Sequence, residues 1–190
     1  MLAGMRKYFK SIVRPVAYSM ARAGISGNQI TLAGLILSVV FVTLIYLKHP
    51  LTALIVMALS SLMDALDGEV ARIRGEQGPR GGFLDSTVDR LEDTLFISSL
   101  YLLGFPPFLV SILVGLSLTT SYIRAKAESL GLKLEGRGII ERGERLLMVF
   151  LVILLRLLNP LVSHWIFLVF LSLSAVTVVQ RILISLRKIG

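Results

Sequence analysis

Apolar residues recur in six long runs along the chain. Each run is close to the roughly 20 residues that a helix needs to cross a bilayer. Short polar or turn-forming stretches, among them "KHP", "GFPP" and "NP", separate the runs. The pattern predicts six transmembrane helices, at about residues 28–48, 51–73, 82–103, 106–130, 142–158 and 161–186.

The N-terminal stretch has a different pattern, in which basic and apolar residues are interspersed over residues 3–25. Such a pattern is typical of an amphipathic helix that lies on a membrane surface. Pro15 is expected to bend or divide this helix, because proline removes a backbone hydrogen bond. The predicted fold is an all-α integral membrane protein, with one domain over residues 1–190.

The composition agrees with a membrane protein and excludes some chemistry. Of 190 residues, 55% are hydrophobic and 17% are charged, and the mean hydropathy is +0.80. The absence of cysteine excludes disulfides and thiolate metal sites. A net charge of +8 would suggest a nucleic-acid partner for a soluble domain. Here it is better explained by basic loops near anionic lipid headgroups, so no nucleic-acid partner is expected.

The basic residues also predict an orientation in the cell membrane. In a six-span topology, 17 of the 20 lysines and arginines lie on one side. Basic loops face the cytoplasm, so both termini and the active site are predicted to lie there. A five-span topology would scatter the basic clusters over both faces.

Acidic residues flank the connection between the second and third runs. Asp64 and Asp67 are three residues apart, and Asp85 and Asp89 are four apart, so each pair shares a helix face. The short connection predicts antiparallel neighbours whose acidic faces oppose each other. Clustered carboxylates repel in a low dielectric unless a cation joins them, and oxygen ligands suit Mg²⁺, Mn²⁺ or Ca²⁺. The alternative is that the acids are solvated or paired with arginines.

Other polar or small residues lie near these acids in the sequence. Glu69, Glu92 and Asp93 are predicted to lie near the site without a metal role, and Asp93 is a candidate to orient a neighbour. Gly68 follows Asp67 directly. A glycine there either allows a ligand to approach closely or serves the close packing of membrane helices.

Residues 64–89 form the pattern D-x2-D-G-x2-A-R-x8-G-x3-D-x3-D, which resembles the signature of the CDP-alcohol phosphotransferase family. The stretch "GNQITLAG" resembles the opening of that family's first span, although Gly27 stands where proline is common. The resemblance extends over most of the chain.

The resemblance implies a six-span, homodimeric enzyme that moves the lipid phosphatidyl-type group from a CDP-lipid to an alcohol and releases CMP. It implies two Mg²⁺ or Mn²⁺ ions, with Asp64, Asp67 and Asp85 as ligands. Asp89 is the implied general base and a further metal ligand. The residues implied to bind the CDP-lipid are Asn28, Thr31, Asp64, Gly68, Ala71, Arg72 and Gly81.

Cations in the last third of the chain bear on the choice of alcohol. They suggest an acceptor that carries its own phosphate, whereas ordinary basic-loop charge suffices for Lys133 and Arg137. The stretch "SYIRAKAE…IERGER" resembles phosphatidylinositol-phosphate synthases, with arginine and lysine exchanged at two positions. That resemblance implies inositol 1-phosphate as acceptor; glycerol 3-phosphate is the main competitor. The implied phosphate ligands are Arg124, Lys126, Arg142 and Arg181.

Several alternatives remain at this stage. The donor is either CDP-diacylglycerol or CDP-archaeol; the composition favours an archaeal ether lipid. A divalent-cation channel or transporter would also use membrane acids, but the outer half of the predicted spans is almost entirely apolar. A structural lipid-binding protein would not explain why acidic residues cluster in the membrane segments.

Overall fold

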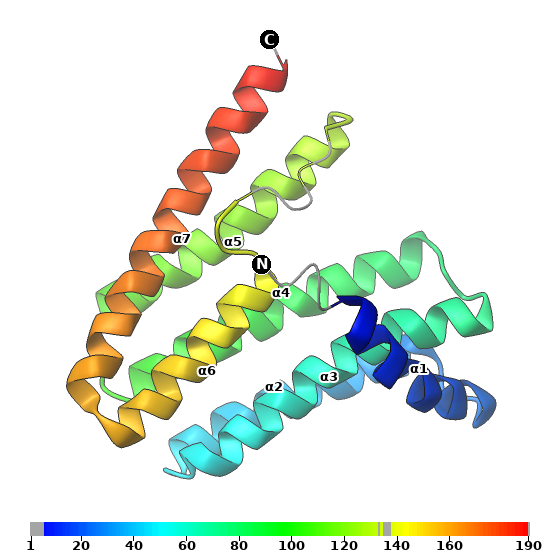
Figure 1. Ribbon diagram of the computed structural model, residues 1–190, viewed down its shortest axis with the longest axis horizontal. Helices are drawn as coiled ribbons and strands as arrows, with labels where there is room; N and C mark the ends of the chain where they lie inside the picture. Colours follow the sequence, from blue (N-terminus) through cyan, green and yellow to red (C-terminus); the bar gives the residue numbers. More distant parts are fainter. Residues whose placement is uncertain (1–5, 133, 135–137, 190) are drawn as a thin grey trace. The chain divides into compact units, whose positions relative to one another are not determined.

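The structure, a computed structural model, describes residues 6–132, 134 and 138–189. Within these residues it is entirely α-helical and has no strand (Figure 1). The seven helices are α1 Arg6–Arg22, α2 Gly27–Tyr46, α3 Pro50–Arg74, α4 Pro79–Leu102, α5 Pro107–Ser129, α6 Arg142–Leu158 and α7 Pro160–Ile189.

Local sequence signals account for where these helices begin and end. Ser26 caps α2 in a capping box with Gln29, which satisfies backbone donors that the first turn leaves open. Pro50, Pro79, Pro107 and Pro160 each begin a helix, where a missing N–H costs nothing. Gly75 ends α3 in the left-handed conformation, with φ of 68°.

The six predicted apolar segments coincide with α2 to α7 within a few residues. The largest differences are of three residues: α7 ends at Ile189 rather than at residue 186, and α4 begins at Pro79 rather than at residue 82, because proline suits a first helical turn. Gly81 and Gly82 therefore belong to the helix. The helix α1 continues through Pro15 and is not divided there. The predicted helix over residues 3–25 begins among residues outside the described part.

Four of the described helices are long and apolar enough to cross a membrane, namely α2, α3, α5 and α7. The protein is thus a multi-pass membrane protein. The helix α4 carries the acidic residues and α6 has only 17 residues, so length and composition do not assign these two as spans. Six spans remain a prediction.

The chain forms two compact units that divide within α4, one ending at Glu92 and the other beginning at Asp93. In the first unit α1 and α2 pack against α3. Its core includes Val13, Ala17 and Val70, so α1 buries one face within the protein. That α1 also lies on a membrane surface, and that residues 1–190 act as one domain, remain predictions.

In the second unit α7 packs against both α5 and α6. Phe167 and Phe170 on α7 and Val152 on α6 are fully buried. Ser163 donates a hydrogen bond of 2.7 Å to the carbonyl oxygen of Val152, which fixes one end of the α6–α7 contact.

Candidate functional site

A cavity of about 540 Å³ lies within the first unit, between the beginning of α2, the end of α3 and the beginning of α4. Five of the seven residues predicted to bind a CDP-lipid line it: Asn28, Thr31, Gly68, Ala71 and Gly81. Of the other two, Arg72 forms an ion pair with Glu69, and Asp64 lies in the acidic cluster described below. The remaining lining residues are Ser26, Gly27, Asp67, Glu76, Gln77, Gly78, Gly82 and Asp85.

The glycines around this cavity serve two different purposes. A Cβ on Gly68 would meet no heavy atom within 4 Å, so this glycine leaves open space rather than serving helix packing. A Cβ on Gly27 would come within 2.9 Å of the carbonyl oxygen of Asp67 and 3.0 Å of the Ala71 Cβ. Gly27 is therefore a point of close approach between α2 and α3, and it lines the cavity.

Asp67 lies at the cavity wall, where a side chain of α2 contacts it. Its side chain is buried, and the hydroxyl of Thr31 donates a hydrogen bond of 2.6 Å to its Oδ2. This bond joins α2 to α3 and explains why a threonine one turn into α2 belongs to the site. Asp85 lines the same cavity from α4, so the structure brings Asp67 and Asp85 to one chamber.

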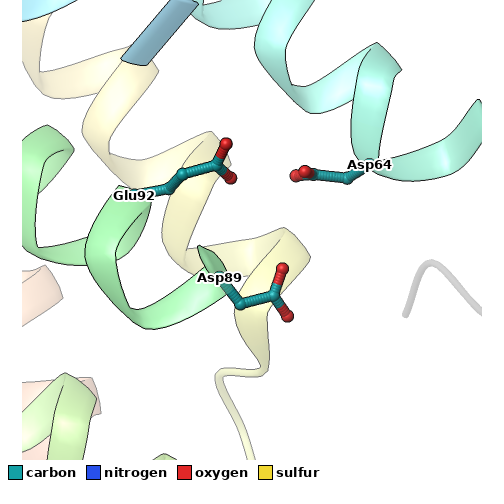
Figure 2. A group of neighbouring side chains, drawn as sticks. All are labelled: Asp64, Asp89 and Glu92. Carbon is teal, nitrogen blue, oxygen red and sulfur yellow. The ribbon is translucent and has the colours of Figure 1, made fainter. Parts of the chain in front are cut away.

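A second acidic group lies in the same unit. One carboxylate oxygen from each of Asp64, Asp89 and Glu92 lies within 4.8 Å of the others. Figure 2 shows Asp89 and Glu92 on one helix, with Glu92 and Asp64 reaching toward each other from opposite helices. Asp89 is also paired with Arg90, at 3.1 Å. Three clustered carboxylates with only oxygen donors fit a hard divalent cation such as Mg²⁺ or Mn²⁺.

Glu92 is the member of this group that the sequence reasoning missed. It is fully buried, and Ser60 on α3 donates a hydrogen bond of 3.2 Å to its Oε1. Ser60 also donates, at 3.0 Å, to the carbonyl oxygen of Gly34 on α2. The spacing of three residues from Asp89 places Glu92 on the same helix face and was the available signal. The predicted ligand set of Asp64, Asp67, Asp85 and Asp89 remains a prediction.

The predicted acceptor cations all lie in the second unit. Arg124 pairs with Glu128 at 2.8 Å on α5, and Lys126 is exposed. Arg181 is buried on α7, where it donates a hydrogen bond of 2.9 Å to the carbonyl oxygen of Thr120. Its Nη2 also lies 3.6 Å from the Glu141 carboxylate. Lys133 and Arg137, assigned to loop charge, lie outside the described residues.

Arg142, the fourth predicted cation, belongs to a buried ion network. Its Nε lies 3.6 Å from Oδ1 of Asp93, whereas Oδ2 of Asp93 accepts a hydrogen bond of 2.7 Å from Arg145. Ser117 donates to the same Oδ2 at 3.2 Å. Arg145 was not among the predicted site residues, although it stands one turn after Arg142 on the same helix.

These features define a membrane protein with an acidic, cation-compatible centre beside a cavity lined by small residues. The chain belongs to the CDP-alcohol phosphatidyltransferase family, which matches residues 25–179. It is thus an enzyme of the CDP-alcohol phosphotransferase class.

Individual relatives are similar over most of the chain. An archaetidylinositol phosphate synthase from Pyrococcus horikoshii is 35% identical over 183 residues, covering 96% of this chain and 95% of the relative. One from Aeropyrum pernix is 36% identical over 156 residues, covering 82% and 80%.

A crystal structure of the phosphatidylinositol phosphate synthase from Mycobacterium tuberculosis with CDP-DAG bound has a TM-score of 0.79 and 31% identity, covering 90% of this chain and 92% of that one. A structure of the same enzyme with manganese and citrate has the same TM-score and identity, covering 91% and 88%.

Proposed function

We propose that the protein transfers the lipid phosphatidyl-type group of a CDP-lipid to inositol 1-phosphate and releases CMP. The observation that carries this proposal is the cavity in which Asp67 and Asp85 stand among small residues, in the same unit as the Asp64–Asp89–Glu92 group. The relatives named for archaetidylinositol phosphate and phosphatidylinositol phosphate synthesis support the choice of acceptor.

A divalent cation, Mg²⁺ or Mn²⁺, is part of the proposal, and the structure with manganese of the Mycobacterium tuberculosis enzyme supports it. Asp64, Asp89 and Glu92 would hold one ion, and Asp67 and Asp85 at the cavity are the proposed ligands of a second. Bound cations would neutralise the donor pyrophosphate and stabilise the charge that develops on the leaving CMP.

The protein's own groups have distinct roles in this scheme. Asp89 accepts the proton of the acceptor hydroxyl as that oxygen attacks phosphorus. Thr31 fixes the orientation of the Asp67 carboxylate through its 2.6 Å hydrogen bond, so no reorganisation is needed when the donor binds. The open space at Gly68 admits the nucleotide close to the backbone.

Recognition of the acceptor phosphate is assigned to Arg124, Lys126, Arg142 and Arg181. Guanidinium groups bind phosphate through paired N–H donors, which a neutral acceptor such as serine or inositol would not require. Glycerol 3-phosphate carries the same phosphate and is the second candidate acceptor. The donor is proposed to be CDP-archaeol or CDP-diacylglycerol, because an apolar surface distinguishes ether from ester linkages poorly.

The wider setting is proposed as well. The protein spans the cell membrane six times, with both termini and the active site on the cytoplasmic side, and it acts as a homodimer. The distribution of basic residues supports this orientation, and the family resemblance supports the dimer.

A single assay tests the proposed reaction. Purified protein is incubated with CDP-lipid and Mg²⁺, and CMP release is measured with inositol 1-phosphate, glycerol 3-phosphate, serine or inositol offered separately. We expect release with inositol 1-phosphate to exceed that with each other acceptor. Faster CMP release with glycerol 3-phosphate would make that compound the preferred acceptor. CMP release with serine or inositol, but with neither phosphorylated alcohol, would refute the proposed phosphate-binding site.

Asp89→Asn is the matched variant, since it keeps the shape of the side chain but cannot accept the proton. We expect it to fold and to lose CMP release by about 100-fold or more. Full activity of this variant would show that Asp89 is not the general base.

The channel alternative has a test of its own. Divalent-metal flux through liposomes that contain the protein, without any CDP-dependent reaction, would support a channel instead of an enzyme.

A further inference from the structure

We infer that Asp93 is a positioning residue for acceptor recognition, which holds Arg142 in place through a buried ion network with Arg145 and Ser117. The inference rests on the proposed function, because it assigns Arg142 to the acceptor phosphate. It adds a residue that would set acceptor affinity without touching the acceptor.

The geometry of Asp93 differs from that of a surface acid. Its side chain is only 2% exposed, and both of its carboxylate oxygens face a guanidinium group. Oδ2 accepts hydrogen bonds from Arg145 at 2.7 Å and from Ser117 at 3.2 Å. Oδ1 lies 3.6 Å from Nε of Arg142. Asp93 thus joins α5 and α6 to its own helix, all within the second unit.

The two arginines differ in what they can do. Arg145 is 4% exposed, so it is enclosed and acts within the fold. The side chain of Arg142 is 22% exposed, and its contact with Asp93 is through Nε, the guanidinium nitrogen nearest its own backbone. A guanidinium carries five N–H donors, and a phosphate uses two of them. Arg142 can therefore be held by Asp93 and bind a phosphate at once.

The network buries charged groups, since the side chains of Asp93 and Arg145 are only 2% and 5% exposed. Burying charges costs desolvation free energy, and a well-packed apolar cluster often stabilises a fold equally well. A fold therefore does not need these ions for stability alone, which agrees with a role in placing Arg142.

The competing explanation is structural: Asp93 serves only as the counter-ion of Arg145. Asp93→Asn alone would not separate the two explanations, because it leaves two arginines without their carboxylate. The double variant Asp93→Asn/Arg145→Gln removes one negative and one positive charge together. The net charge of the network is then the same as in wild type, but the carboxylate that contacts Arg142 is still missing.

The test measures steady-state kinetics of CMP release in wild type and both variants, with acceptor and CDP-lipid varied separately. We expect the KM for inositol 1-phosphate to rise about tenfold or more in both variants, because small misplacements of a positioning group have large effects. The KM for CDP-lipid is expected to stay within about twofold. The thermal midpoint should fall in Asp93→Asn and recover in the double variant.

Ser163→Ala is the control for general destabilisation, since it removes the buried hydrogen bond to Val152 in the same unit. We expect a lower thermal midpoint and an unchanged KM for the acceptor. An unchanged acceptor KM in Asp93→Asn, recovery of that KM in the double variant, or an equal rise in Ser163→Ala would each overturn the inference. Failure of wild type to transfer to any phosphorylated acceptor would instead overturn the proposed function, and this inference with it.

Discussion

At the scale of single residues, the burial of Glu92 carries the most information about the acidic centre. A fully buried carboxylate is costly unless its charge is compensated, and Glu92 accepts a hydrogen bond of 3.2 Å from Ser60. Asp64 and Asp89 stand close by, and their negative charges repel that of Glu92. A bound cation would turn this repulsion into attraction, which makes Glu92 a direct test of the metal site.

We predict that Glu92→Gln weakens metal binding while preserving the fold. The amide has the same size, and its oxygen can still accept the hydrogen bond from Ser60, but one negative charge is lost. The Mn²⁺ concentration that gives half-maximal thermal stabilisation should rise about tenfold, and the concentration for half-maximal CMP release should rise with it. Both are measured by titrating Mn²⁺ into metal-free protein.

Glu69→Gln is the matched control, because it neutralises an acid of α3 that is not part of the Asp64–Asp89–Glu92 group. Its Mn²⁺ midpoint for thermal stabilisation should match that of wild type. A wild-type midpoint in Glu92→Gln would mean that Glu92 has no part in the metal site.

The acidic residues also show how far sequence reasoning reaches at this scale. Helical spacing was sufficient to select Asp64, Asp67, Asp85 and Asp89, because i, i+3 and i, i+4 positions share a face. The same spacing places Glu92 on the face of Asp89, but the burial of Glu92 and its contact with Ser60, 32 residues away in the chain, could not be read from spacing. Nor could it divide the aspartates between the cavity and the acidic group, since that depends on how the helices pack.

At the scale of elements, the boundaries of the helices were predictable and their packing was not. Prolines, the Ser26 cap and Gly75 are local signals, and they mark helix ends within a few residues. The close approach of α2 to α3 is a tertiary feature. It is seen in the contacts of Gly27. In the sequence, this position showed only that glycine replaces the proline common in the family.

We predict that Gly27→Ala separates the beginning of α2 from α3. The added Cβ would meet the backbone carbonyl of Asp67 at 2.9 Å, and a backbone atom cannot rotate away as a flexible side chain can. The expected loss of stability is about 1–3 kcal/mol, as for other overpacked sites. The KM for CDP-lipid should rise as well, because Thr31 would lose its hydrogen bond to Asp67.

Gly115→Ala on α5 is the corresponding control. A Cβ there would meet no heavy atom within 4 Å, so alanine should leave the thermal midpoint unchanged or raise it slightly. Thermal unfolding in detergent compares the two variants. Equal midpoints for Gly27→Ala and Gly115→Ala would contradict the proposed close packing.

At the scale of the whole molecule, the residues proposed for the donor and for the acceptor fall in different units. The cavity and the acidic group lie in the first unit, and the arginines assigned to the acceptor lie in the second. The helix α4 contributes to both, with Asp89 before the division and Asp93 after it. Charge and hydropathy predicted a membrane protein and the motif over residues 64–89 indicated its class, but this division is seen only in the contacts.

The last prediction concerns the membrane topology, and the absence of cysteine from the natural chain makes it directly testable. If α4 and α6 both cross the membrane, the two ends of each must lie on opposite sides. Single cysteines are placed at Arg80 and Leu102 for α4, and at Gly143 and Leu158 for α6. We expect a membrane-impermeant maleimide to label positions 80 and 143 only from the cytoplasmic side, and positions 102 and 158 only from the outside. Labelling of 80 and 102, or of 143 and 158, from the same side would exclude that helix as a span and reduce the topology below six.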